Sequence, residues 1–296
     1  MGRKHGTKIR SSKRDAFSGS AILAALILCA VITAIPFISE LAVSLSSKKA
    51  SMMNQINLLP VEFTLASWKY VLTKGGIWKP FFISVSSTAI GTALAVVISV
   101  LLAYPLSKSE FRPSRYVMIF VVFTMIFTAP KVPYFLVLRS YGLYNKYWVL
   151  ILPHILTAYN LIIVRTFFKQ FPRELEEAAE IDGCGKFRLL FQIVIPSSKA
   201  VLATVGLFYG VTMWNQYEHP LMFIQDMSLF PLQAKIRAFV DGGSELQAVT
   251  MQATANYTQS TLSAAAVVFA MIPVLIVYPF LQKYFAKGAM LGSVKG

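Results

Sequence analysis

The amino-acid sequence predicts an all-α membrane protein with six transmembrane helices and a helix–turn–helix between the fourth and the fifth. Hydrophobic residues make up 56% of the 296 positions, whereas charged residues make up only 14%. Mean hydropathy is +0.60, which excludes an ordinary water-soluble domain. The charged residues are also segregated along the chain. They leave long apolar stretches near the ~20 residues that a bilayer-spanning helix needs.

The positions of the charged residues mark the six expected helices. Uncharged stretches cover residues 80–107, 147–164, 200–217 and 246–282. Two more apolar runs, residues 21–45 and 116–138, each contain one ionisable residue, Glu40 and Lys131 respectively. Each of these runs is long enough to predict one spanning helix.

The distribution of Lys and Arg predicts the orientation, because cytoplasmic segments carry an excess of both. Basic residues are dense in residues 1–20, 108–115, 165–199 and 283–296, which lie on one side of six spans. Both termini are therefore expected in the cytoplasm. The same bias, with anionic membrane lipid as its partner, accounts for the net charge of +15 without nucleic acid.

The sequence shows no catalytic or metal-binding pattern. Cys29 lies in the first expected helix and Cys184 in a cytoplasmic loop, so the two thiols are not expected to meet. His5, His154 and His219 are scattered without ligand spacing. His154 is interpreted as a hydrogen-bonded packing residue. The chain is therefore expected to be no enzyme, and to hold neither a metal ion nor a cofactor of its own.

One charged segment interrupts the apolar chain. Its acidic residues are Glu174, Glu176, Glu177, Glu180 and Asp182. Pro172 suits a first helical position, and the helix dipole favours negative charge in the first turns. Leu175, Ala178 and Ala179 share one narrow face of this predicted helix. The pair Asp182-Gly183 predicts a turn in which Gly183 or Gly185 takes a positive φ.

A second helix is expected after this turn, and it is expected to break at Pro196. Its apolar stripe consists of Phe187, Leu190, Phe191, Val194 and Ile195. The stripe is expected to rest on the ends of the spanning helices, while the acidic helix faces the cytoplasm. The segment is then either a simple membrane-surface element or a docking element for a soluble protein. A helix on anionic lipid prefers basic residues, so the acidic cluster favours a protein partner.

At these residues the sequence resembles a known family. EAAEIDG at residues 177–183, followed by Phe187 and by Ile195-Pro196, is similar to the EAA loop of ABC importer permeases. The resemblance extends over residues 59–296. It includes LPVEFTLASWKYVL, YGLYNKYWVLILPHILTAYNLIIVRTFF and TMWNQYEHPLMFI. The C-terminal IPVLIVYPFLQKYFAKGAMLGSVKG resembles the end of the maltose-type second permease subunit.

The resemblance implies a transmembrane permease subunit of a bacterial, binding-protein-dependent importer of carbohydrate, with an oligosaccharide as the expected substrate. It implies a plasma-membrane location and, as partners, a second homologous permease, two ATPase subunits and an extracytoplasmic sugar-binding protein. ATP and Mg²⁺ are expected in the ATPase subunits. The residues expected to couple this chain to them are Glu177, Ala178, Ala179, Asp182, Gly183, Phe187 and Pro196.

The expected organisation is a cytoplasmic tail (1–20), a six-helix permease domain (21–284) and a C-terminal cytoplasmic tail (285–296). The coupling loop covers residues 172–198, and outer loops cover residues 48–79 and 225–260. Two positions depart from the family pattern. Cys184 stands where Ala is usual, and Ala200 stands where a second proline is frequent.

The substrate pathway is predicted from polar and aromatic residues inside the spans. Sugars are bound by aromatic faces and by hydrogen bonds to their hydroxyls, and buried polar residues face a bundle interior or a wet cavity. The candidates on the fourth and fifth helices are Tyr159, Asn160, Tyr209, Trp214, Asn215, Tyr217 and Glu218. For each of them, interior packing or a place in the interfacial aromatic belt is the alternative.

Two other function classes remain open from the residues alone. An ion-coupled secondary transporter needs ionisable groups in the membrane, for which the candidates are Glu40, Lys131 and Glu218. All three lie near the expected outer ends of helices. A membrane-embedded enzyme needs a cluster of His, Cys or carboxylate groups at one depth, and the sequence shows no such cluster.

Overall fold

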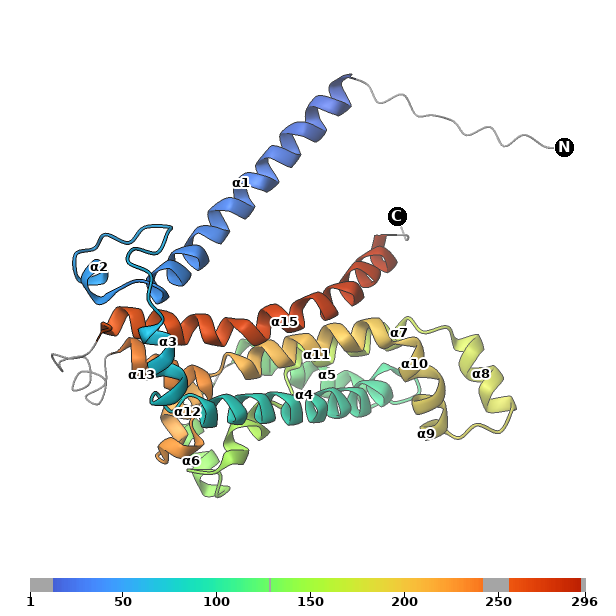
Figure 1. Ribbon diagram of the computed structural model, residues 1–296. Helices are drawn as coiled ribbons and strands as arrows, with labels where there is room; N and C mark the ends of the chain where they lie inside the picture. The colour runs from blue at the N-terminus through green and yellow to red at the C-terminus, as the bar shows by residue number, and fades with distance from the viewer. Residues whose placement is uncertain (1–12, 128, 242–255, 294–296) are drawn as a thin grey trace. The chain divides into compact units, whose positions relative to one another are not determined.

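The computed structural model describes residues 13–127, 129–241 and 256–293, and it describes the side chains of residues 19–127, 129–241 and 256–279. Regular structure in these ranges is helical throughout, as the sequence predicts (Figure 1). The first part of the expected N-terminal tail lies outside the described residues. So do residues 242–255 of the second expected outer loop and the last residues of the expected C-terminal tail.

The described helices follow one another without any described strand between them. In chain order they are α1 (Lys13–Ser44), α2 (Lys48–Met52), α3 (Ala66–Thr73), α4 (Trp78–Ser107), α5 (Ser114–Ile126), α6 (Lys131–Ser140), the 3₁₀ helices η1 (Tyr147–Leu150) and η2 (Leu152–His154), α7 (Ala158–Lys169), α8 (Arg173–Ile181), α9 (Lys186–Leu189), the π-helix η3 (Leu190–Val194), α10 (Ile195–Ser197), α11 (Lys199–Trp214), α12 (Glu218–Phe223), the 3₁₀ helix η4 (Met227–Leu229), α13 (Leu232–Val240) and α15 (Gln259–Ser293).

Three of these helices are long and apolar enough to cross a membrane, over Gly19–Ser44, Trp78–Ser107 and Gln259–Pro279. Two further candidates are bent pairs. Tyr147–His154 and Ala158–Lys169 meet at 46°, and Lys186–Ser197 and Lys199–Trp214 meet at 83°. If each pair is one span, the described residues contain up to five. The total of six spans therefore stays a prediction.

The third expected span is not one continuous helix. The run at residues 116–138 is divided between α5, which ends at Ile126, and α6, which begins at Lys131. Pro130 separates the two pieces. A proline has no N–H to donate and disfavours helical backbone at the residue before it, so Pro130 favours a break at this point.

Contacts divide the chain into two units, one with residues 1–70 and 244–268 and the other with residues 71–243 and 269–296. In the second unit α4 is central, because α5, α7, α11 and α13 all pack against it (Figure 1). Gly91, Ala95, Ser99 and Ala103 follow one another at intervals of four residues, and all are buried. Such a stripe of small residues lets neighbouring helices approach closely.

The first unit contains α1, α2, most of α3 and the start of α15. Short polar side chains hold it together. Ser67 Oγ donates to Thr261 Oγ1 at 2.9 Å, and Ser51 Oγ lies 2.9 Å from the hydroxyl oxygen of Thr258. The apolar side chains of α1 from residue 22 to residue 38 are mostly exposed, which is normal for a helix in contact with lipid.

Candidate functional site

The acidic segment folds as the predicted helix and turn at the start of residues 172–198, which we call the helical loop. α8 begins after Pro172, and its carboxyl end is closed by the backbone. The N–H groups of residues 182, 183 and 184 donate to carbonyls of the last turn at 2.9–3.1 Å. Gly183 has a φ of +76°, so the predicted positive φ is confirmed at the first of the two candidate glycines.

The second half of the helical loop differs from the prediction. α9 passes directly into the π-helix η3, and the chain then continues through α10. Pro196 lies inside α10, and the break falls at Ser198, not at the proline. The π-turn explains this continuation. It widens the helix where the Pro196 ring approaches the carbonyl four residues earlier, which is the clash that normally ends a helix.

One face of the helical loop is buried against the ends of the longer helices. Its buried apolar side chains are Ala179, Leu189, Leu190 and Val194. They belong to one cluster with Tyr104, Leu161, Val164 and Phe168 of α4 and α7. Cys184 packs against the same cluster from the turn. The helical loop is therefore backed by a packed apolar layer.

The opposite face carries large apolar side chains in solvent. Ile181 is 86% exposed and Phe187 is 75% exposed, and Leu175 and Phe191 are also exposed. The prediction that the apolar stripe forms one continuous buried face is therefore wrong. Leu190 and Val194 are buried, whereas Phe187 and Phe191 are exposed, so the five residues are divided between two faces.

The narrow face predicted on the first helix is also divided. Ala179 is buried, but Leu175 and Ala178 are exposed. Ala178, Asp182 and Glu177 are all accessible around the turn. The exposed tip of the helical loop thus combines acidic groups with large apolar side chains, and exposed apolar patches mark sites of interaction with another molecule.

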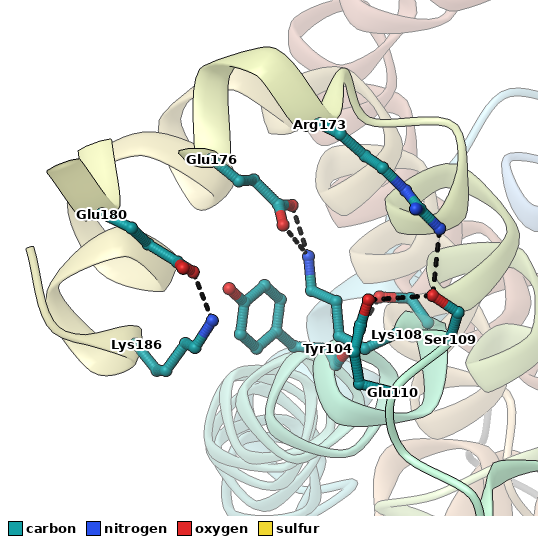
Figure 2. Close-up of polar contacts among 9 residues, drawn as sticks. Tyr104, Lys108, Ser109, Glu110, Arg173, Glu176, Glu180 and Lys186 are labelled. Carbon is teal, nitrogen blue, oxygen red and sulfur yellow. Dashed lines mark hydrogen bonds and ion pairs between the residues drawn. The ribbon is translucent and has the colours of Figure 1, made fainter. Parts of the chain in front are cut away.

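A polar network joins α8 to the end of α4 (Figure 2). Lys108 Nζ donates to both carboxylate oxygens of Glu176. Arg173 Nη2 donates to Ser109 Oγ at 3.0 Å, and Ser109 Oγ donates to Glu110 Oε1 at 2.9 Å. Both links start from one face of α8, because their residues on that helix are three positions apart.

A second ion pair lies within the helical loop itself, where Lys186 Nζ donates to Glu180 Oε1 (Figure 2). This hydrogen bond raises the pKa of Lys186 above its usual value. The pKa of Glu110 is lowered, first by its own backbone N–H and then by the Ser109 hydroxyl. These groups therefore keep their charges near neutral pH.

A hollow of about 1460 Å³ lies beside the network, between α8 and α5. Its wall combines apolar side chains, among them Met118 and Ile119, with the cations Arg112, Arg115 and Lys169. The described residues contain no group of three or more His, Cys, Asp or Glu that could hold a metal ion. The hollow leaves α8 room to shift relative to α5.

The candidate pathway residues divide between the interior and the surface of the second unit. Tyr209 is 1% exposed, and its Oη lies 2.8 Å from Ser99 Oγ and accepts from the N–H of Thr157 at 3.2 Å. Asn160 and Trp214 are also buried. Tyr209 therefore connects α4, α11 and the start of α7 inside the protein, and its hydroxyl has two hydrogen-bond partners.

The other candidates lie at the surface. Tyr159 is 57% exposed, and Tyr217 is 40% exposed. Asn215 Nδ2 donates to the carbonyl of Val211, and Glu218 forms an exposed ion pair with Lys131 at 3.6 Å. The candidates do not converge on one site of this chain. An exposed aromatic ring such as Tyr159 is free to face a second protein or a wet passage.

The structure also contains buried polar groups that the sequence did not predict. Thr88 and Thr92 on α4 each have a buried Oγ1 without a partner among the described residues. The rings of His154 and His219 lie 4.9 Å apart, although these histidines are distant in sequence. His154 Nε2 is buried without a partner in the described structure, so the expected hydrogen-bonded packing is not seen at that atom.

Comparison with known proteins gives consistent matches. The family described as "Binding-protein-dependent transport system inner membrane component" matches residues 81–290. The polygalacturonan/rhamnogalacturonan transport system permease protein YtcP of Bacillus subtilis (strain 168) is 41% identical over 273 residues, 92% of this chain and 96% of that protein. Protein LplC of the same organism is 40% identical, over 90% of each chain.

A solved structure is also similar, the "Crystal structure of a bacterial ABC transporter involved in the import of the acidic polysaccharide alginate". The matched chain has a TM-score of 0.85 and is 29% identical, over 93% of this chain and 98% of that one. This likeness extends over nearly the whole chain. The residues that match the family, 81–290, include α8 and its turn.

Proposed function

This chain belongs to the family of binding-protein-dependent transport system inner membrane components, and we propose from that premise that it is a permease subunit of an ATP-driven importer of oligosaccharides. It crosses the bacterial plasma membrane with both termini in the cytoplasm. ATP is bound and hydrolysed by two separate ATPase subunits. A second homologous permease and an extracytoplasmic binding protein complete the assembly.

The observation that carries the proposal is the outward face of the helical loop. Ile181 and Phe187 are among the large apolar side chains in solvent, while the opposite face of the same loop is packed. A rigid element that presents apolar and acidic side chains at its tip suits insertion into a cleft of a soluble partner. In the proposed assembly that partner is the ATPase.

The residues of the tip have separate roles in this proposal. Glu177 and Asp182 offer carboxylates to the ATPase, and both are exposed. Ala178 is small and exposed, so it allows close approach of the partner backbone. Ala179 is buried and fixes α8 on its inner face. Gly183 supplies the positive φ that turns the chain back at the tip.

Transport then follows from differential binding to two states. ATP draws the two ATPases together and displaces the helical loop, and the binding protein delivers sugar at the other side of the membrane. Both events must favour the same outward-open state in order to be coupled. Pro196 and the π-turn of η3 lie where the helical loop joins α11, the bent junction through which movement passes to that span.

The substrate class is supported by the relatives. One is named for polygalacturonan and rhamnogalacturonan, and the similar crystal structure is titled for alginate. We therefore expect oligosaccharides, with acidic sugars tested first. The exposed rings of Tyr159 and Tyr217 are the aromatic faces that could stack on sugar rings. Buried Asn160, Tyr209 and Trp214 support the walls of the passage, and Asn215 and Glu218 lie at its outer rim.

The ion-coupled alternative finds less support in the positions of the ionisable groups. Lys131 and Glu218 pair with each other at the surface, with side chains 76% and 64% exposed. A coupling-ion site needs ionisable groups that are shielded within the membrane. Family membership also favours the ATP-driven importer.

Copurification tests the proposal. The chain is expressed with its partner permease and a tagged ATPase from the same bacterium, and the membrane complex is isolated in mild detergent. We expect Asp182→Lys to release the ATPase, since it reverses a charge at the tip. Glu174→Lys is the matched control, because Glu174 is also exposed but lies at the opposite end of α8.

Two results decide the matter. Retention of the ATPase by the wild type and its loss with Asp182→Lys alone support the docking function. If the wild-type chain does not retain the ATPase, or if both variants retain it equally, the helical loop is not the docking element. Transport assays with galacturonate, alginate and neutral oligosaccharides then assign the sugar.

A further inference from the structure

The first residue after α4 is joined to α8 by a shielded ion pair. Lys108 caps the end of α4, and Glu176 lies in the first turn of α8 (Figure 2). Their side chains are only 24% and 14% exposed. Lys108 Nζ also lies 4.5 Å from the ring centroid of Tyr104, so the ammonium group is held between a carboxylate and an aromatic face.

A second link lies one turn earlier on α8. Arg173 donates to Ser109, which in turn donates to Glu110, immediately beyond Lys108 in the chain. Two points on one face of α8 are therefore tied to one short segment at the end of α4. Two attachment points restrict rotation of α8 as well as its translation.

The rest of α8 is held weakly. Glu174, Leu175, Glu177 and Ala178 are exposed, and Ala179 is the buried residue of this helix. Within the described residues, the two links to Lys108 and Ser109 are the side-chain hydrogen bonds that connect α8 with anything outside the helical loop. The hollow between α8 and α5 leaves space for movement on one side.

We propose that Lys108 and Glu176 form a clamp that passes a displacement of α8 to α4, and that both are positioning residues for the coupling step. This inference rests on the proposed function, in which α8 binds the ATPase. Separation of a shielded pair leaves uncompensated charge, so the two helices move together while the pair is intact. Because α4 is central to its unit, the displacement reaches α7 and α11 through direct packing.

A fluorescent label at the far end of α4 measures this transmission without any sugar. Lys79 is exposed at the start of α4, and a helix of 30 residues separates it from Lys108 by about 45 Å. Lys79→Cys is labelled in a background with Cys29→Ser and Cys184→Ala. The full complex with its ATPases is placed in lipid nanodiscs, and ATP with Mg²⁺ is added.

Two paired variants separate the clamp from other ion pairs. Lys108→Met with Glu176→Leu removes both charges together, so no unpaired charge is left to unfold the protein. Lys186→Met with Glu180→Leu is the matched control, because it removes an ion pair that lies entirely within the helical loop. Lys108→Glu with Glu176→Lys restores a pair with reversed polarity.

We expect the clamp variant to keep its ATPases and lose the response of the label about fivefold or more, as for removal of an ordinary allosteric coupling. The control variant should keep the response, and the reversed pair should regain most of it. Ser109→Ala cuts the exposed second link and should reduce the response less.

Several outcomes would overturn the clamp. The label could respond fully in the clamp variant, or the control could lose as much response. If the clamp variant releases the ATPases, Glu176 is a docking contact instead of a positioning residue. A wild-type complex that binds no ATPase, or shows no response to ATP, contradicts the proposed function itself and is thereby distinguished from failure of the clamp alone.

Discussion

Glu176 and Glu177 are neighbours in the sequence, but Glu176 is paired with Lys108 at the end of α4 whereas Glu177 is exposed. Glu176 accepts from Lys108 and is 14% exposed at its side chain. Glu177 is exposed and has no hydrogen-bond or ion-pair partner among the described residues. Adjacent positions on a helix point about 100° apart, so one carboxylate can serve the fold while the next remains available to another molecule.

The two glutamates should therefore respond differently to neutralisation. Glu176→Gln leaves the shielded Lys108 ammonium without its carboxylate, so we expect it to lower the free energy of unfolding by about 1–3 kcal/mol. Glu177→Gln should change it by no more than about 0.5 kcal/mol. Thermal unfolding of the two purified variants measures the difference. Equal melting temperatures would contradict the assignment of the ion pair to Glu176.

The exposed phenylalanine of α9 should matter for binding and not for folding. Phe187→Ser removes a side chain that is 75% exposed, so we expect a stability change within about 0.5 kcal/mol. Retention of the ATPase should nevertheless fall, because an apolar anchor is lost from the tip. Leu190→Ser is the contrasting variant, since Leu190 is 2% exposed and its loss should prevent normal folding. If Phe187→Ser retains the ATPase in full, the apolar face is not part of the contact.

In the turn after α8, a side chain at Gly185 should be tolerated, whereas a side chain at Gly183 should destabilise the turn. A Cβ atom at Gly183 or at Gly185 would meet no atom within 4 Å. Only Gly183 has a positive φ, so Gly183→Ala should cost about 1–2 kcal/mol, and Gly185→Ala should cost little or nothing. Hydrogen exchange of the turn amides detects the local loss. Similar protection in both variants would show that backbone strain does not control this turn.

The positions of α4, α8 and the turn could be predicted because each depends on local pattern. An uncharged stretch defines α4, and acidic residues followed by Asp182-Gly183 define α8 and its end. The interruption between α5 and α6 was signalled by Pro130, but the apolar composition of residues 116–138 concealed it. Apolar runs predict burial or lipid contact, and they do not predict backbone continuity.

The clamp could not be predicted, because its partners are 68 residues apart. In the sequence, Lys108 is one basic residue at the expected cytoplasmic end of a spanning helix, and Glu176 is one of several acidic residues in its segment. Only the packing of the end of α4 beneath α8 brings them together. The outward position of Phe187 was missed for a related reason, since an apolar side chain at helical spacing is buried only where another element packs against it, and the sequence does not show which side of α9 is covered.

Tyr209 should behave as a structural residue and not as a sugar ligand. Tyr209→Phe removes buried hydrogen bonds to Ser99 and to the N–H of Thr157, so we expect destabilisation by about 1–3 kcal/mol. Sugar preference should be unchanged. Tyr159→Ala should show the reverse, with little loss of stability and weaker transport, because its ring is 57% exposed. Competition between oligosaccharides for transport into vesicles measures the sugar preference. An altered preference in Tyr209→Phe would show that Tyr209 contacts the sugar.

The half-buried His219 of α12 should make the protein less stable in mild acid. Burial, and next the neighbouring His154, lower the pKa of His219 from 6.5 to about 4. Its Nε2 lies 2.9 Å from Tyr134 Oη, and the ring of Phe223 packs against it. The unfolded chain therefore binds a proton near pH 6.5 that the folded chain resists until about pH 4, so stability falls as the pH is lowered through that window and is unaffected above it.

His219→Gln tests this linkage, since glutamine can still accept from the Tyr134 hydroxyl but does not titrate. Melting temperatures of the wild type and the variant are compared at pH 8, where His219 is neutral in both states, and then at steps down to about pH 5, where only the unfolded chain is protonated. As the pH falls, the melting temperature of the wild type should decrease relative to that of the variant. Parallel profiles would mean that His219 is already hydrated in the folded protein, and that acid sensitivity comes from the carboxylates.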